Sequence, residues 1–191
     1  MSKFFYKDKP VIGLDISSTG IKIMAIDPKK WAVNGYGQLD LDPIKVRESL
    51  EDDENTFLTD SIKTLLKDNI IGTVQGDRVA IAVPTSRSYT RTFVLPASAE
   101  KSLNEAVLLE AEQYIPIPVS TLYIDYQIIE RDRKTIVVLM SAVSRLVIDN
   151  ITRSVTNAGL MPVLIVPSIT SVGRVLTSTE DGSLPTVIVD I

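Results

Sequence analysis

The sequence predicts an α/β protein with a mixed sheet and a smaller α+β subdomain inserted into it. Short β-branched segments occur in runs, and helical segments separate some of these runs, which is typical of a mixed sheet. The segment 86–140 has its own order of strand, helix, strand and strand, which predicts one helix covering a three-stranded sheet. A chain of 191 residues, of which 45% are hydrophobic, is long enough to bury such cores.

The composition excludes several classes of function. The net charge of −4 argues against a nucleic-acid-binding protein, which would carry a basic face. The chain has no cysteine and no histidine, which argues against disulfides, thiolate metal sites, triad hydrolases and zinc enzymes. Any catalysis would have to come from carboxylates, lysines and a bound Mg²⁺ ion.

Residues 1–10 are expected to form a loose N-terminal arm. They lack the long apolar stretch and the small-residue cleavage site of a signal peptide. No segment approaches the ~18–20 apolar residues of a membrane helix, so the expected location is the cytoplasm. The alternative is that Phe4, Phe5 and Tyr6, which lie among lysines, contact a membrane surface.

The first part of the chain predicts three strands and a helix. The strands are short and bounded by turn residues, and they span Val11–Leu14, Ile21–Asp27 and Trp31–Leu39. Residues 27–30 have the chemistry of a hairpin turn. After an acidic loop at 51–55, apolar residues at helical spacing predict a helix, with Leu58, Ile62, Leu65 and Leu66 on one face.

A strand at Arg78–Val83 leads into the inserted segment. The strands of that segment are expected at Ser88–Leu95, Leu122–Glu130 and Thr135–Val143. A helix follows the first of them, with Ser98 as its expected N-cap. Its buried stripe is expected to contain Leu103, Val107, Ala111 and Tyr114.

The last part predicts a helix, a strand, a second helix and a final strand. Ser144 is the expected cap of the first helix and Gly159 the residue that ends it. A strand at Met161–Val166 precedes a helix that opens at 167–168, and the chain closes with a strand at Thr186–Ile191. The buried face of the first helix is expected to contain Val147, Ile151, Val155 and Ala158.

The segment after the first predicted strand has the residues of a phosphate-binding loop. Asp15 lies where the strand ends, and Ser17, Ser18 and Thr19 offer hydroxyl and backbone N–H groups. A carboxylate at this position can hold Mg²⁺ through water, and Lys22 can neutralise a phosphate. The alternative is a β-turn rich in serine and threonine with a surface lysine, and the spacing alone does not separate the two interpretations.

A similar pattern ends the chain. The run 187–189 predicts a strand, and Asp190 is the acid at its end. Two such loops facing each other form a nucleotide cleft. Asp190 would begin the second of these loops. Because the chain stops at Ile191, the remainder of that loop and the second lobe are expected to be absent.

Three segments, in order along the chain, resemble an established family. Residues 11–22, VIGLDISSTGIK, are similar to the first phosphate motif of the actin-like superfamily and, more narrowly, of the PilM family of type IV pilus assembly proteins, which is related to FtsA. Residues 108–118, LLEAEQYIPIP, followed by 122–126, LYIDY, resemble the PilM segment that enters an inserted subdomain. Residues 187–191, VIVDI, resemble the start of the second phosphate motif, so the resemblance covers essentially the whole chain.

The resemblance implies a fold and a cofactor. The fold would be an actin-like (ribonuclease H-like) subdomain 1A, formed by 11–85 and 141–191, with an SHS2-type subdomain 1C inserted at 86–140. The cofactor would be ATP with Mg²⁺. The family commonly has glycine where this chain has Ser17, and a chain with one lobe is expected to bind ATP weakly and to show no independent catalysis. The implied phosphate and magnesium contacts are Asp15, Ser17, Ser18, Thr19, Lys22 and Asp190.

The resemblance also implies a partner. Family members recruit the cytoplasmic N-terminal tail of the inner-membrane protein PilN into a groove beside subdomain 1C and lie under the membrane within the pilus machinery. Ile115 and Ile117, held by flanking prolines, are expected to line this groove, while Tyr114 is assigned to the core. Arg87 and Arg91 would share a strand face and meet an acidic partner or keep the edge soluble. The final strand also offers a surface for self-association.

Two rival functions stay open. An FtsA-like cell-division filament protein should carry a C-terminal amphipathic membrane helix, which this chain does not show. A sugar or acetate kinase should have a second lobe and a catalytic carboxylate near its sugar site, and no motif for either is seen. The stretch 113–118, QYIPIP, is the main feature that favours a pilus adaptor over the FtsA-like alternative.

Overall fold

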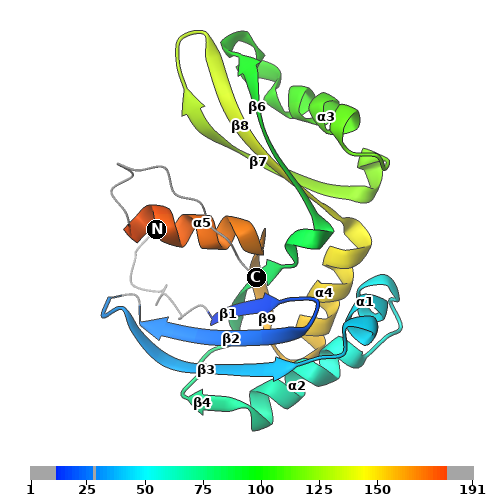
Figure 1. The fold of residues 1–191 in the computed structure, drawn as a ribbon, viewed down its shortest axis with the longest axis vertical. Coiled ribbons are helices and arrows are strands. Elements are labelled where there is room, and N and C mark those ends of the chain that lie inside the picture. Colours follow the sequence, from blue (N-terminus) through cyan, green and yellow to red (C-terminus); the bar gives the residue numbers. More distant parts are fainter. Residues whose placement is uncertain (1–11, 28, 180–191) are drawn as a thin grey trace, which may run out of the picture.

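Two sheets, stacked one above the other, make up the chain (Figure 1). The computed structural model describes residues 12–27 and 29–179. The expected N-terminal arm (1–10), Asp190 and the predicted strand Thr186–Ile191 lie outside the described residues. Within them, the mixed α/β architecture predicted from the sequence is confirmed.

The larger sheet mixes parallel and antiparallel pairs in the order β4-β3-β2-β1-β5-β9. Neighbours from β4 to β1 pair antiparallel, whereas β1 pairs parallel with β5, and β5 with β9. Parallel neighbours need long crossover connections, and here these contain the helices and the whole inserted segment. The strands are β1 (Ile12–Ile16), β2 (Gly20–Asp27), β3 (Ala32–Asp40), β4 (Ile70–Gly72), β5 (Arg78–Val83) and β9 (Met161–Pro167).

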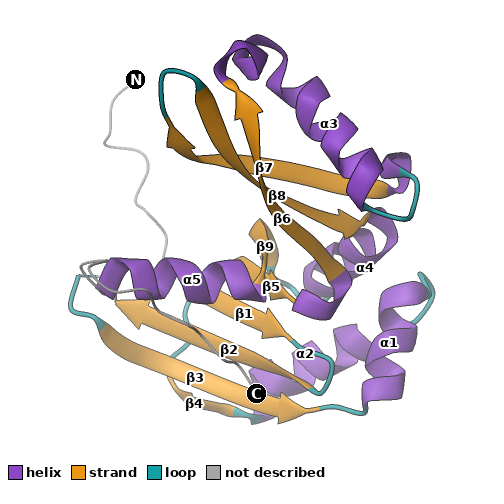
Figure 2. Cartoon of the chain, turned by 45° about the horizontal axis from the view of Figure 1, so that its top comes forward, coloured by secondary structure: helices purple, strands orange, loops and turns teal. Residues whose placement is uncertain are grey.

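One face of the larger sheet is covered by three helices and the other by one (Figure 2). The three are α1 (Pro43–Glu51), α2 (Phe57–Asp68) and α4 (Arg145–Asn157), and α5 (Ser168–Thr179) lies on the opposite face. Alternate strand residues point toward the three helices, so this core is entirely aliphatic in its strands. Its most buried members include Ile12, Leu14, Ile23, Ile81 and Ile151.

The patterns described above do not predict helix α1, although its start signal is present in the sequence. Asp42 is the N-cap, and its carboxylate accepts hydrogen bonds from the backbone N–H groups of Ile44 at 2.8 Å and Lys45 at 3.3 Å. Pro43 occupies the first helical position, where no backbone donor is needed. Strand β4 was also missed, because three residues are too few to show a periodic pattern.

The smaller sheet is antiparallel, with the order β6-β8-β7. Its strands are β6 (Ser88–Pro96), β7 (Leu122–Arg131) and β8 (Thr135–Ser144), close to the predicted ranges. One face packs against α3 (Leu103–Tyr114) and forms a second core, separate from the first. The central strand β8 supplies four residues of this core that are completely buried: Ile136, Val138, Met140 and Ala142.

Helix α3 corrects three sequence predictions. Residues 97–102 form a 3₁₀ turn, so Ser98 is not the N-cap of the α-helix. Tyr114, assigned to the core, is 44% exposed, and Ile115, expected to be exposed in a groove, is only 3% exposed. The reason is that the helix ends at Tyr114 and the backbone becomes extended at Ile115, which turns the next side chain inward.

Helix α4 ties the two sheets together. It begins directly after β8, with Ser144 at the N-cap position but without a side-chain cap hydrogen bond. It ends before Gly159, whose φ of +89° suits glycine and confirms the predicted end. The buried Asn150 side chain donates a hydrogen bond of 3.0 Å to the carbonyl of Leu50, which fastens α4 to α1.

Candidate functional site

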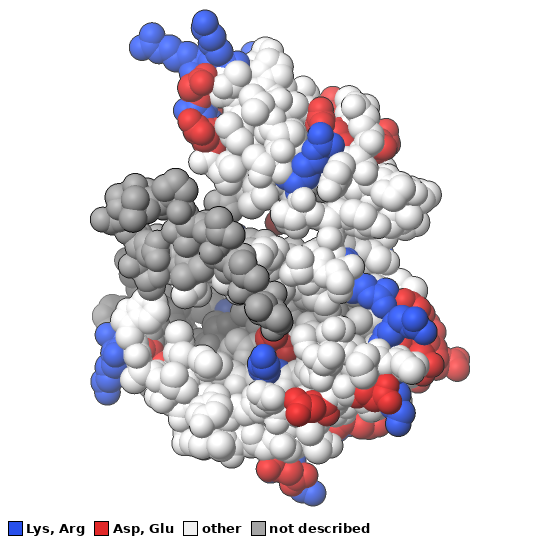
Figure 3. All heavy atoms as spheres, viewed as in Figure 1, with Lys and Arg blue, Asp and Glu red and all other residues white. Residues whose placement is uncertain are grey.

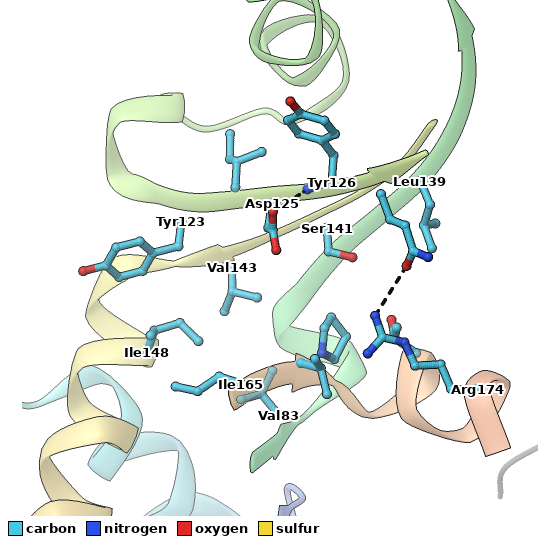
Figure 4. Close-up of a pocket in the computed structure, with 15 residues that line it drawn as sticks. Val83, Tyr123, Asp125, Tyr126, Leu139, Ser141, Val143, Ile148, Ile165 and Arg174 are labelled. Atoms are coloured by element: carbon cyan, nitrogen blue, oxygen red, sulfur yellow. Dashed lines mark hydrogen bonds between the residues drawn. The ribbon is translucent and has the colours of Figure 1, made fainter. Parts of the chain in front are cut away.

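A groove separates the smaller sheet from the larger one (Figure 4). Its upper wall is formed by β7 and β8, and its lower wall by the ends of β5 and β9 and the first turns of α5. Helix α4 contributes Ile148 at one end. The groove has a volume of about 310 Å³, which is room for a few side chains of an extended segment.

The surface of the groove is largely apolar. The main apolar side chains are Val83, Leu139, Val143, Ile148 and Ile165, which come from the four elements β5, β8, α4 and β9. Three of these elements belong to the larger subdomain and β8 to the smaller sheet, so the groove exists only because the two sheets are held together. An apolar concave surface with a few polar groups is the usual form of a binding site.

Strand β7 runs along the groove as an edge strand. Residues 123–127 line it consecutively although Ile124 and Tyr126 pack against the small core, which indicates that the backbone of the strand borders the groove. Among the described strands β7 pairs only with β8, so its other edge is available for a further strand. An extended peptide can add to such an edge through backbone hydrogen bonds.

Three polar side chains define the chemistry of the groove. The exposed Asp125 carboxylate points into it (Figure 4), and its Oδ1 atom accepts a hydrogen bond of 2.9 Å from the backbone N–H of Tyr126. From the opposite wall, Arg174 donates to Gln127 Oε1 over 3.4 Å, and this long bond spans the groove. A bond of this length between exposed groups is weak and can be exchanged for contacts to a ligand.

Tyr123 closes the end of the groove beside α4. Its hydroxyl donates to Asp149 Oδ1 at 3.1 Å, and the guanidinium of Arg145 lies 4.5 Å from the centre of its ring. Both partners belong to α4, so the ring is held from the helix that joins the two sheets. This end of the groove is therefore rigidly built.

A buried hydroxyl lies on the same face of the small sheet. Thr90 on β6 is the register partner of Ser141 on β8, which lines the groove. Among the described residues, Thr90 Oγ1 is the buried side-chain atom that has no hydrogen-bond partner. A buried polar atom without a partner is costly, and such atoms concentrate at sites where a ligand or water supplies the bond.

The residues expected to form the groove lie elsewhere. Arg87 precedes β6 in a 3₁₀ turn and forms an ion pair of 2.7 Å with Glu51 of α1. Arg91 stacks on the ring of Tyr114, with its guanidinium 4.6 Å from the ring centre. Ile115 is buried in the small core, and Ile117 is 38% exposed, but neither lines the groove between the sheets.

The sequence of β7 carries a signal for the groove. Along β7 the even-numbered Leu122, Ile124 and Tyr126 face the small core, and Tyr123 and Asp125 alternate with them. Such alternation in a strand indicates a second face with its own environment. The position of Arg174 has no comparable signal, because it reaches the groove only through the packing of α5.

A second, larger cleft of about 1060 Å³ lies on the open face of the larger sheet. Asp15 and Lys22 are register partners on β1 and β2 and both line this cleft. The carboxylate and the ammonium group therefore lie side by side on one wall, as the phosphate-loop interpretation requires. Asp190, expected on the facing wall, lies outside the described residues.

The turn between β1 and β2 is held by its own hydrogen bonds. The backbone N–H and the hydroxyl of Ser17 both donate to the carbonyl of Gly20, each at 2.9 Å. Ser17 is not in the left-handed region, so replacing the family's glycine here causes no backbone strain. Gly20 itself is required, since a Cβ atom would lie 2.8 Å from the carbonyl oxygen of Leu39. The hydroxyl of Ser17 is thus used within the turn, whereas Ser18 and Thr19 are exposed.

The chemistry of this wall fits a magnesium-bound polyphosphate. The described residues contain no group of three or more acidic side chains that could hold a metal ion alone. In a magnesium-bound polyphosphate, Asp15 would hold the hydration shell of the ion and Lys22 would face a phosphate. The two residues that these roles require, Asp15 and Lys22, both line the cleft.

None of the helices in the described part of the chain is both long and apolar enough to span a bilayer.

Comparison with known proteins gives a consistent answer. The family profile described as "Type IV pilus assembly protein PilM" matches residues 13–178. The solved structure of a "PilM-PilN type IV pilus biogenesis complex" is similar with a TM-score of 0.76 and 21% identity, over 88% of this chain and 50% of that chain. This chain thus spans about half the length of that relative.

Two further structures are similar. The cytoplasmic domain of EpsL, an inner membrane component of the type II secretion system of Vibrio cholerae, matches with a TM-score of 0.56 and 15% identity, over 83% of this chain and 57% of that one. A Bacteroides thetaiotaomicron protein with an actin-like ATPase fold and unknown function has a TM-score of 0.49 and 12% identity, over 94% and 60% of the two chains. The first of these likenesses extends the shared fold beyond pilus proteins, and the expected actin-like fold, limited to a single lobe, is confirmed.

Proposed function

The chain belongs to the family of type IV pilus assembly proteins PilM, and we propose that it is an adaptor that binds the cytoplasmic tail of a PilN-like inner-membrane protein in the groove between its two sheets. The tail would bring the chain to the cytoplasmic face of the inner membrane, where a pilus machine is assembled. The output of this activity is binding rather than catalysis.

The observation that carries the proposal is the apolar groove with the edge strand β7 along its wall. A disordered tail that binds as an added strand gains backbone hydrogen bonds to β7, while its alternate side chains contact the apolar side chains that line the groove. Leu139 and Val143 of β8 form this apolar part of the upper wall, and their positions are fixed within the sheet. Binding to a preformed surface limits the entropy lost on association.

The charges in the groove restrict the tail that fits. Asp125 lies among apolar side chains on one wall, so a basic group on the tail would be favoured there and an acidic one disfavoured. Because Asp125 is exposed, this charge should act mainly on the association rate and its dependence on salt. Arg174 would release Gln127 when the tail occupies the space that their hydrogen bond spans.

Binding of a fluorescent peptide with the N-terminal tail of the PilN homologue from the same genome tests the proposal. Ser141→Trp should place a bulky ring in the groove and weaken binding by about tenfold or more, since the ring removes the space for at least one tail side chain. Asp125→Asn should weaken binding less and reduce its salt dependence. Fluorescence anisotropy gives both quantities, and circular dichroism checks that each variant is folded.

Ile117→Asp is the matched control, because this exposed isoleucine was the alternative groove residue and does not line the groove described here. It should leave affinity within about twofold of the parent, with Arg91→Glu behaving in the same way. The proposal is contradicted if Ile117→Asp abolishes binding while Ser141→Trp does not. Absence of any binding by the parent chain also contradicts it.

We also propose that the wall formed by Asp15 and Lys22 binds the phosphates of Mg-ATP. The support is their side-by-side register on β1 and β2 at a cleft large enough for a nucleotide. Two side chains on one wall supply few charge-assisted hydrogen bonds, each worth about 1.5–3 kcal/mol, so binding to this wall alone is expected to be weak. The expected affinity is therefore at least about a hundredfold below that of a site with two walls.

Isothermal titration calorimetry with Mg-ATP measures this affinity. A weak signal that disappears in Asp15→Ala and in Lys22→Ala is the expected result. Binding in the micromolar range that Asp15→Ala abolishes would show that one wall is sufficient. Binding that neither substitution alters would place the nucleotide away from this wall.

A further inference from the structure

The turn between β2 and β3 holds a residue that the backbone there does not favour. Asp27 and Ala32 are the last register pair of the hairpin, so the turn lies between these two residues. Trp31 has a φ of +50° and is the sole non-glycine residue in the left-handed region among the described residues. Glycine and asparagine are the residues that suit this conformation in hairpin loops, and a bulky side chain raises its free energy.

The strained tryptophan is also almost fully exposed. Its side chain is 74% accessible, so burial within this chain does not compensate for the backbone conformation. The turn itself is well formed, since Asp27 Oδ1 accepts hydrogen bonds from the backbone N–H groups of Lys29 at 2.9 Å and Lys30 at 3.3 Å. A stable turn that presents a large aromatic ring to solvent in an unfavourable backbone conformation indicates a contact outside the molecule.

The neighbours of Trp31 define the chemistry of that contact. Ile26 and Val33, a register pair next to the turn, are 38% and 54% exposed. Lys29 and Lys30 are exposed, and neither is in an ion pair with an acid of the described residues, because the carboxylate of Asp27 faces backbone donors. The turn therefore combines an aromatic ring, two aliphatic side chains and two positive charges.

This local charge is opposite to that of the whole chain, whose net charge is −4. Basic side chains lie at the β2–β3 turn on the left of the molecule and at the β7–β8 turn at its top, while acidic and basic side chains are mixed over α1 and α2 (Figure 3). An anionic surface would attract Lys29 and Lys30 at the turn, although the chain as a whole is negatively charged.

We propose that the β2–β3 turn is a contact site for an anionic lipid surface. Tryptophan prefers the boundary between headgroups and acyl chains, because its ring is apolar and its N–H group still reaches a polar partner. Lysines next to it are attracted by anionic headgroups, and their aliphatic stems lie along the apolar boundary. The small size of the patch makes the contact weak by itself, so it supplements the tail-mediated recruitment proposed above and does not depend on it.

Trp31 is the only tryptophan of the chain, and its fluorescence reports directly on the proposed contact. The 191-residue chain is titrated at low salt with vesicles of equimolar phosphatidylglycerol and phosphatidylcholine, and separately with vesicles of phosphatidylcholine alone. The anionic vesicles should shift the emission to shorter wavelength and carry the protein into the pellet on centrifugation. High salt should reverse both effects.

Two variants and a charge-matched control test the residues. Lys29→Glu/Lys30→Glu should lower partitioning to anionic vesicles by about tenfold or more. Trp31→Gly should lower it to a similar extent without lowering the unfolding temperature, because glycine suits the backbone of the turn. Lys63→Glu/Lys67→Glu changes the net charge equally at exposed positions of α2 and should retain partitioning within about twofold.

Three results would overturn the proposal. The first is an unchanged Trp31 emission with anionic vesicles at low salt. The second is equal partitioning to the uncharged vesicles, which would show that the lysines do not select the lipid. The third is an equal loss in the two lysine double variants, which would make net charge, and not the turn, responsible.

Discussion

The two sheets of this chain are built alike on one face and differently on the other. Each has one face packed against helices through aliphatic side chains. The remaining face of the larger sheet carries Asp15 and Lys22 at the ends of its strands, and that of the smaller sheet carries Ser141 and Leu139 above the groove. The comparison teaches that in each sheet the helix-covered face forms the core, while residues of the other face line a groove or cleft.

The two cores also differ in how the chain assembles them. The smaller core comes from one continuous segment between β6 and β8, whereas the larger core needs α4 and β9 to return after the insertion. Its contacts therefore span a longer sequence separation, which slows folding. If the two cores are independent, a defect in one should leave the other protected.

The largest expected effect is a cavity in the larger core. Ile81 is completely buried in β5, the strand between β1 and β9, so Ile81→Ala should lower the free energy of unfolding by about 2–5 kcal/mol. Urea denaturation measures the loss. Hydrogen exchange should show reduced protection in β1 and β5 but retained protection in β8, and equal loss in both sheets would mean that the cores unfold as one unit.

The reciprocal change is an overpacked contact in the smaller core. Ala111 is fully buried on α3 against the small sheet, and Ala111→Trp should cost about 1–3 kcal/mol of stability. Exchange should accelerate in α3 and β8 and stay slow in β1. An Ala111→Trp variant as stable as the parent would show that the space between α3 and the sheet is not closely packed.

A smaller effect is expected at the N-terminus of α1, a helix that packs on the larger core. Asp42→Ala removes the side-chain acceptor for the N–H groups of Ile44 and Lys45 and should destabilise the chain by about 0.5–2 kcal/mol. Asp42→Asn retains an acceptor and should recover most of the loss. If both substitutions cost the same, charge and not capping would explain the role of Asp42.

The smallest effect is expected at Asp132 of the smaller sheet, whose carboxylate accepts backbone hydrogen bonds as that of Asp42 does. In the β7–β8 turn, the backbone N–H groups of Lys134 and Thr135 hold the pKa of Asp132 below its ordinary value of 3.8. A carboxyl whose pKa is lowered by folding stabilises the folded state above its unfolded pKa. That contribution is lost as the pH falls through the lower, folded pKa.

Thermal unfolding followed from neutral pH to below 3.8 should therefore show a decline at the acidic end that is shallower in Asp132→Asn, which cannot ionise. The difference will be small because the side chain is exposed. A steeper decline in the variant would have the wrong sign for this explanation.

Much of this fold could be predicted from the sequence because its signals are local. The ranges of β5, β7 and β8 follow from short β-branched runs bounded by turns, and Gly159 ends α4 as its position suggests. The pairing of Asp15 with Lys22 was equally readable, since these residues flank a tight turn and must become neighbours in a hairpin. Both features depend on residues less than ten positions apart.

The groove could not be predicted in the same way because it is made by distant elements. Its walls bring β7 next to β9 and α5, and no local pattern specifies that contact. Ile115 was placed wrongly because the end of α3 at Tyr114 changes which side chain points inward, and that change depends on one residue. Arg87 was placed wrongly because its partner Glu51 lies 36 positions away, on a helix that was itself not predicted.

The link between the sheets has a mechanical consequence. The chain passes upward from β5 to β6 and downward from β8 to α4, and the two passages are joined where Ser88 pairs with Val143. Each passage therefore restrains the other, and the spacing between the two sheets depends on this pair and on α4. Asn150 in turn fastens α4 to α1 on the helix-covered side of the larger sheet. The geometry of the groove therefore depends on the helix layer of the larger sheet.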